Sequence, residues 1–216
     1  MTDQDTTRVS LHAVAEFLLA GPQYDQHQTI RLRVTPGGFA TVEGPDLRVE
    51  GTAVVVGTRH VGLHGRSIPE VAAELGVTPY SLAGLYPDGS GVSMDHTLRL
   101  DAGFAAKIEE AFQRGQEALT IFAPEVDAVL WPEHFDLGIA VDEVNYGVSA
   151  GDKYLAVPYA YVGPWSFPAA GYSADPTQFT GPFWNAPFGA ARPVAQIDDL
   201  VGFMSEGRAL AAAATH

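Results

Sequence analysis

The chain has 216 residues, of which 46% are apolar, a formal net charge of −14 and no cysteine. This length and composition predict one folded domain, and the lack of cysteine excludes disulfides, thiolate metal sites and cysteine nucleophiles. The negative charge argues against nucleic acid and anionic membranes as partners, and no apolar run reaches the ~20 residues of a membrane span, so we expect a cytoplasmic protein.

The N-terminal part is predicted to combine one helix with several short strands. Apolar residues at helical spacing run from Val9 to Ala20, Gly21-Pro22 is typical of a helix end, and residues 1–8 are expected to be flexible. The apolar period then changes to two, which predicts a hairpin and further strands at 29–34, 39–42, 47–50 and 52–56.

Two further helices carry recognisable start signals. Ser67 and Glu70 have the spacing of a capping box, and Asp101 is placed to cap a helix that runs to about Leu119. Residues 67–87 are similar in pattern to a helix-turn-helix, but residues 80–86 contain no Arg, Lys, Asn or Gln to contact DNA. We therefore favour a helical pair that covers a sheet.

The C-terminal part is predicted to return to strands before a long loop. Strands are indicated at 128–131, 135–141, 144–148 and 155–162. Residues 163–193 form an irregular segment rich in proline, glycine and aromatic residues, and a helix follows at 198–212. The expected fold class is α+β: a curved, largely antiparallel β-sheet or partial barrel with packed helices, in a single domain from 9 to 210 with a flexible end at 211–216.

The stretch "LWPEHFDLGIAVDEVNYGVSAGD", residues 130–152, places polar groups beside a core strand. Strand alternation puts Phe135, Leu137, Ile139 and Val141 on the core face and His134, Asp136, Gly138, Ala140 and Asp142 on the other. Glu133 would then lie on the apolar side, and Gly138 and Ala140 would let a ligand approach the backbone. His134 and Asp136 are therefore the predicted catalytic pair, with Asp136 orienting the imidazole; an ordinary solvent-facing strand is the alternative.

The alternation changes phase at Asp142-Glu143, where we expect a turn or bulge, so that Asn145 projects opposite Tyr146. "GVSAG", residues 147–151, matches the nucleophile-elbow pattern G-x-S-x-G. The following residues favour a strand over the required helix, and the only later histidine is His216. An elbow at Ser149 is therefore disfavoured.

The aromatic segment is predicted to cover the His134 row as a lid. The predicted ligand-binding residues are Asn145, Tyr146, Trp165, Trp184 and Asn185. The competing hypothesis is a binding module without catalysis, in which Trp165 and Trp184 are stacking platforms for carbohydrate or another flat ligand. The lid over His134, with Tyr172 among its aromatic residues, is the feature that would distinguish a pocket from a surface.

Histidine spacing also raises the question of a metal. His60 and His64 share a face in a helix, but the flanking glycines disfavour a helix, and in a strand they would lie about 13 Å apart. We assign no metal ligand and no cofactor from the sequence, and a metal-dependent hydrolase stays open as a variant.

Five stretches, "LWPEHFDLGIAVDEVNYGVSAGD", "PYAYVGPW", "FWNAPFGAA", "LLAGPQY" and "TIRLRVTPGGF", resemble uncharacterised proteins of GC-rich actinobacteria. The resemblance implies no activity, cofactor or catalytic residue. The leading hypothesis is a small-molecule-binding protein or enzyme with an acid–base His/Asp pocket; a homo-oligomer is possible.

Overall fold

The computed structural model describes residues 2–167 and 179–214, and these form two compact units. The first unit comprises Met1–Gln113 with Val129–Asp136, and the second comprises Arg114–Ala128 with Leu137–His216. The sequence predicts a single domain from 9 to 210. The fold class is α+β, with a curved antiparallel sheet and packed helices, as the sequence predicts.

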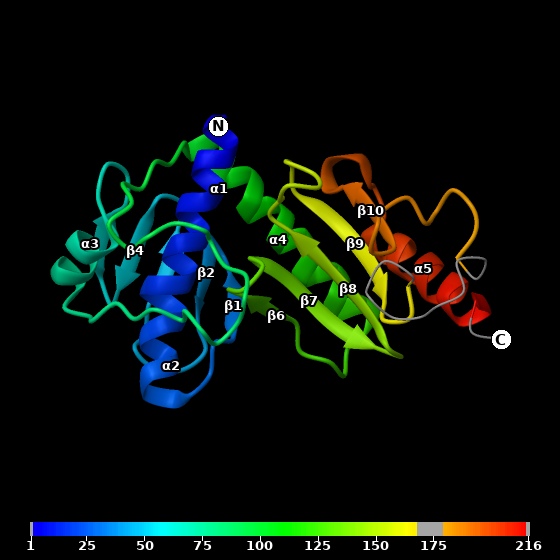
Figure 1. Cartoon of the computed structure of the whole chain (residues 1–216), viewed down its shortest axis with the longest axis horizontal. Helices are drawn as coiled ribbons and strands as arrows, with labels where there is room; N and C mark the ends of the chain where they lie inside the picture. The colour runs from blue at the N-terminus through cyan, green and yellow to red at the C-terminus, as the bar shows by residue number, and fades with distance from the viewer. Residues whose placement is uncertain (1, 168–178, 215–216) are drawn as a thin grey trace. The chain divides into compact units, whose positions relative to one another are not determined.

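The first unit packs a long N-terminal helical segment against short antiparallel strands (Figure 1). Its strands follow the order β6-β1-β2-β3-β4-β5. The helical elements are α1 (Asp3–Ala13), the π-helix η1 (Val14–Ala20), α2 (Gly21–His27), α3 (Ile68–Leu75) and the start of α4 (Ala102–Phe122). The strands are β1 (Leu32–Thr35), β2 (Gly38–Thr41), β3 (Arg48–Glu50), β4 (Ala53–Val56), β5 (Arg59–Gly62) and β6 (Val129–Trp131).

The N-terminal helical segment is longer at both ends than the sequence predicts. Thr2 and Asp5 form a capping box, so α1 begins within the residues expected to be flexible. The helix also continues through Gly21-Pro22, which we predict to end it. A π-helical turn precedes Pro22, which has no N–H to donate, and the carbonyl of Phe17, five residues earlier, accepts from the backbone N–H of Tyr80 at 3.1 Å instead.

The second unit is a four-stranded antiparallel sheet in the order β10-β9-β8-β7, with helices against one face. Its strands are β7 (Asp136–Val141, of which Asp136 is counted with the first unit), β8 (Val144–Ser149), β9 (Tyr159–Pro164) and β10 (Ala190–Pro193). The 3-10 helix η3 (Val194–Gln196) precedes α5 (Leu200–Ala214), which lies along β9 and β8. The expected flexible end at 211–216 is helical as far as Ala214.

The core face of the second unit is the one that strand alternation predicts. Leu137 and Ile139 of β7 are buried, as are Val144, Tyr146 and Val148 of β8. Gly115 of α4 and Gly207 of α5 leave no room for a side chain, since an added Cβ would lie 2.7 Å from Val148 and 2.8 Å from Val162 respectively. The small residues therefore let both helices approach the strands closely.

Capping predictions are confirmed at α3 and α4. Ser67 and Glu70 form the capping box of α3, and the Asp101 carboxylate accepts the N–H of Phe104. Residues 80–86 do not form the second helix of the predicted pair, and strands β5 and β10 lie where the sequence predicts none. Among the described residues, no helix is both long and apolar enough to cross a membrane.

Candidate functional site

His134 lies in the turn before β7, so the alternation of the strand does not set its direction. Residues 132–135 form a turn between β6 and β7, and Phe135 has a φ of +52°, in the left-handed region. Strand alternation therefore starts only at Asp136 and does not extend to His134, so the pairing of His134 with Asp136 stays a prediction. The Nε2 atom of His134 instead lies 3.8 Å from Oε1 of Glu133, the residue that alternation placed on the apolar side.

A third residue, distant in sequence, completes this group. Asp88, Glu133 and His134 each present one ligand atom, and these three atoms lie within 4.8 Å of one another. Asp88 is exposed and belongs to the "YPDGSG" segment, residues 86–91, which reverses the chain through several bends. We name these three residues the Asp88 cluster.

A buried histidine holds the turn that carries two members of the cluster. The Nε2–H of His12 donates to the carbonyl oxygen of Pro132 at 2.6 Å, and its ring stacks on Phe135 with centroids 5.4 Å apart. His12 is only 6% exposed. Burial lowers the pKa of His12 to about 4, so the imidazole stays neutral and keeps its role as a donor.

A buried carboxylate holds the turn that carries Asp88. Glu16, in the π-helical segment, is 6% exposed and accepts from the backbone N–H of Ser90 at 3.0 Å and from its hydroxyl at 2.7 Å. A Cβ at Gly89 would lie 2.9 Å from a Glu16 oxygen, so a side chain there would displace the carboxylate. His12 and Glu16 are four residues apart, so one stretch of helix holds both turns.

A tyrosine hydroxyl is buried in the same region. The Oη atom of Tyr86 is enclosed and has no hydrogen-bond partner among the described residues. Burial raises the pKa of Tyr86, and the negative charges of Glu16 and Glu133 raise it further. The phenol therefore stays protonated, as a hydrogen-bond donor close to these carboxylates.

The residue types of the Asp88 cluster fit a divalent cation. Imidazole nitrogen and carboxylate oxygen are the ligands that Zn²⁺ and Mn²⁺ share in proteins, and three protein ligands leave positions for water or substrate. The His134 side chain is 57% exposed, so the cluster is open to solvent. The same arrangement without an ion is a histidine flanked by two carboxylates, which suits proton transfer.

The other histidine pair of the sequence does not form a metal site. His60 lies on β5, with Nδ1 3.9 Å from a Glu50 oxygen. His64 lies beyond the end of β5, and its Nδ1 is occupied by the backbone of Leu100, whose N–H is 3.1 Å away. The two rings therefore have separate partners, and His60 is an exposed histidine beside one carboxylate.

The predicted ligand-approach face of β7 is filled by the protein itself. A Cβ at Gly138 would lie 2.7 Å from the Tyr161 hydroxyl, and one at Gly147 would lie 2.5 Å from the same atom. The ring of Tyr161 thus crosses β8 and β7 over two glycines. These glycines make room for an aromatic side chain from β9 rather than for a ligand. Ser149 is buried, and a strand follows it instead of the helix of a nucleophile elbow.

The predicted ligand-binding residues Asn145, Tyr146 and Trp165 divide between the two faces of the second unit. The indole N–H of Trp165 donates to the side-chain oxygen of Asn145 at 3.0 Å, and both residues are exposed. Tyr146 is fully buried against Phe122, with ring centroids 4.7 Å apart, and burial raises its pKa to about 12. Tyr146 is therefore a core residue, whereas Asn145 and Trp165 share a surface.

Trp184 and Asn185 have structural contacts in the loop before β10. The ring of Trp184 is half-buried among phenylalanines 167, 179 and 183. The amide of Asn185 bonds both the N–H and the carbonyl of Ala191 at 2.9 Å. Tyr172 lies outside the described residues. His134 belongs to the first unit and this loop to the second, so the lid over His134 stays a prediction.

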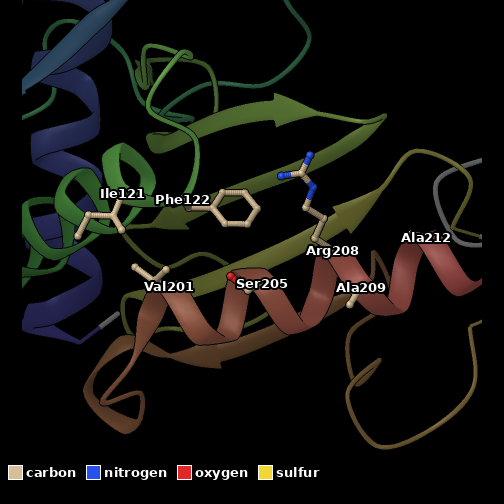
Figure 2. A pocket seen from close by; sticks show the side chains of 7 residues that line it. All are labelled: Ile121, Phe122, Val201, Ser205, Arg208, Ala209 and Ala212. Carbon is tan, nitrogen blue, oxygen red and sulfur yellow. The ribbon is translucent and has the colours of Figure 1, made fainter.

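An open groove lies between α5 and the end of α4 in the second unit (Figure 2). It has a volume of about 370 Å³ and is lined by apolar residues together with Ser205 and Arg208. Figure 2 shows the Arg208 side chain reaching past the ring of Phe122, and its guanidinium pairs with Asp142. None of the predicted site residues lines this groove, and no histidine or carboxylate lines it either.

Comparisons of the chain with models of protein families, with curated proteins and with solved structures found no match. The candidate site therefore depends on its geometry alone. The resemblance to actinobacterial proteins stays a prediction.

Proposed function

We propose that this protein binds a small molecule through a divalent cation held by Asp88, Glu133 and His134, as a metal-dependent hydrolase would. The observation that carries the proposal is the convergence of three metal-ligating atoms within 4.8 Å from two separate turns. Convergence alone is common among exposed acids. Here it includes an imidazole, and a buried side chain of one helix fixes each turn.

The buried contacts are the second support. Second-shell groups that fix the ligands of a metal typically contribute 10- to 100-fold to metal affinity. His12 bonds the residue directly before Glu133, and Glu16 bonds the residue two positions after Asp88. Burial of these two polar side chains costs desolvation free energy. Each side chain offsets that cost through a hydrogen bond that positions one part of the site.

The expected chemistry follows from the ligand set. A divalent ion with three protein ligands lowers the pKa of a bound water toward neutrality and polarises an ester or amide carbonyl of a bound substrate. The Tyr86 hydroxyl is enclosed and stays protonated beside the charges of Glu16 and Glu133, so it would not contact a ligand directly. The site is open on the His134 side, where a small molecule can reach the ion.

Calorimetric titration of chelator-treated protein with ZnCl₂ and MnCl₂ tests the proposal. The wild type should bind one equivalent, and His134→Ala should lose at least 100-fold in affinity. His60→Ala is the matched control, because His60 is 58% exposed and 3.9 Å from one carboxylate, against 57% and 3.8 Å for His134. Equal loss in both variants, or no binding by the wild type, would contradict the proposal.

A further inference from the structure

The hairpin that joins β7 and β8 holds two residues in a strained backbone conformation. Asp142 and Glu143 have φ values of +53° and +60°, in the left-handed region that hairpin turns usually assign to Asn and Gly. Such residues persist where surrounding contacts hold them. Here Arg208 pairs with the Asp142 carboxylate, and the backbone N–H of Trp165 donates to the Glu143 carbonyl at 2.9 Å.

Trp165 is anchored at this hairpin, yet its ring is not buried. The residue is 47% exposed, and its indole N–H is satisfied by Asn145 at 3.0 Å. The strand register explains the contact: Pro164 pairs with Val144 and Gly163 with Asn145, so Trp165 follows directly after the paired residues. Two hydrogen bonds therefore fix the orientation of a large aromatic face that stays in contact with water.

The contrast with Trp184 shows that this exposure is particular to Trp165. Trp184 lies among three phenylalanine rings with centroids 5.0 to 6.0 Å away. Trp165 has none of these partners; its indole N–H donates to the side chain of Asn145, and its backbone N–H donates to the carbonyl of Glu143. A rigid aromatic plane with an amide beside it is suited to a ring-shaped ligand with polar edges.

We propose that Trp165 and Asn145, the Trp165 surface, form a binding site for a neutral hexopyranose. The apolar face of the sugar ring would stack on the indole, while the Asn145 amide N–H₂ donates to a hydroxyl oxygen of the sugar. The net charge of −14 disfavours phosphorylated sugars and nucleotides, which share the flat shape but carry negative charge. This site lies in the second unit and does not depend on the proposed metal site.

Intrinsic tryptophan fluorescence of the full chain tests the sugar site, with glucose, mannose, galactose, N-acetylglucosamine, cellobiose and maltose as probes. At least one sugar should give a saturable emission shift. Trp165→Ala should weaken its binding at least tenfold, Trp165→Tyr should restore part of it, and Asn145→Ala should weaken it severalfold. Trp184→Phe is the control that keeps the Trp165 signal and should leave affinity unchanged, while circular dichroism verifies folding.

Three outcomes would overturn the sugar site. One is the absence of a shift with any probe at 100 mM, and another is undiminished binding by Trp165→Ala. The third is an emission shift that follows protein concentration without sugar, which would assign the Trp165 surface to self-association. Because the Asp88 cluster is tested by metal titration, failure of one proposal leaves the other standing.

Discussion

The Asp88 cluster of the first unit and the Trp165 surface of the second are held in place by different kinds of contact. In the first unit, buried side chains of one helix, His12 and Glu16, reach out and fix two turns that are far apart in sequence. In the second, strand register and the backbone of a hairpin fix Trp165 beside Asn145. Substituting one buried polar residue should therefore disturb the Asp88 cluster. The Trp165 surface should be disturbed by substitutions that distort the sheet.

The largest expected effect is on the stability of the second unit, whose sheet carries the Trp165 surface. Gly147→Ala would place a Cβ 2.3 Å from the Leu137 carbonyl oxygen and 2.5 Å from the Tyr161 hydroxyl. Backbone cannot yield as a flexible side chain can, so we expect a loss on the order of 3 kcal/mol in the free energy of unfolding, measured by urea denaturation. Gly138→Ala meets mainly the end of Tyr161 and should cost less. A larger loss of unfolding free energy for Gly138→Ala than for Gly147→Ala would contradict this explanation of why the two positions are glycine.

The next effect concerns the buried contacts of the first site. The pKa of His12 is about 4 when folded, against about 6.5 for a free histidine, so the unfolded chain binds a proton more readily. Stability contributed by neutral His12 should therefore be complete above pH 6.5 and fall as the pH drops toward 4, by about 3 kcal/mol in all. His12→Gln, whose amide can still donate to Pro132, should flatten this part of the stability curve in urea denaturation at stepped pH. Parallel curves for the two proteins would show that His12 is not the titrating group.

A third prediction distinguishes Asp136, the carboxylate that the sequence favours, from Glu133, which belongs to the Asp88 cluster. Glu133→Gln should lower Zn²⁺ affinity at least tenfold, because it removes a ligand oxygen charge while keeping the side-chain shape. Asp136→Asn, in β7, should leave the affinity within about twofold. The reverse result in calorimetric titration would favour His134 and Asp136 as the pair and remove Glu133 from the site.

The smallest expected effect tests the hydrogen bond that orients Trp165. Asn145→Ala removes the partner of the exposed indole N–H, which water can replace, so the unfolding free energy should fall by about 1 kcal/mol or less. The tryptophan emission should nonetheless change, because the ring loses its fixed orientation. A loss of several kcal/mol would make Asn145 a residue of the fold rather than of a binding surface.

Much of the fold is predictable from the sequence because its signals are local. The capping residues of α3 and α4 and the alternation at Val144, Tyr146 and Val148 each depend on neighbours within a few positions. The N-terminal helix passes through Gly21-Pro22 because a π-helical turn accommodates the proline, and helix-end rules do not include that geometry.

The candidate site is less predictable, for two physical reasons. Phe135 adopts a left-handed conformation that aromatic residues rarely take, so the alternation that pairs His134 with Asp136 does not extend to His134. Asp88 is remote in sequence and reaches the cluster only through Glu16 and the turn that it holds. The "PDG" of that turn is a signal for chain reversal, not for a metal ligand.

Anomalous diffraction at the zinc edge, from crystals grown with ZnCl₂, tests the central claim most directly. The account predicts a peak bonded at about 2.0–2.2 Å to an oxygen of Asp88, an oxygen of Glu133 and a nitrogen of His134, and no peak in crystals of His134→Ala. A zinc peak only between His60 and Glu50 would contradict the account. The absence of any peak at the Asp88 cluster in crystals grown with saturating ZnCl₂ would contradict it as well.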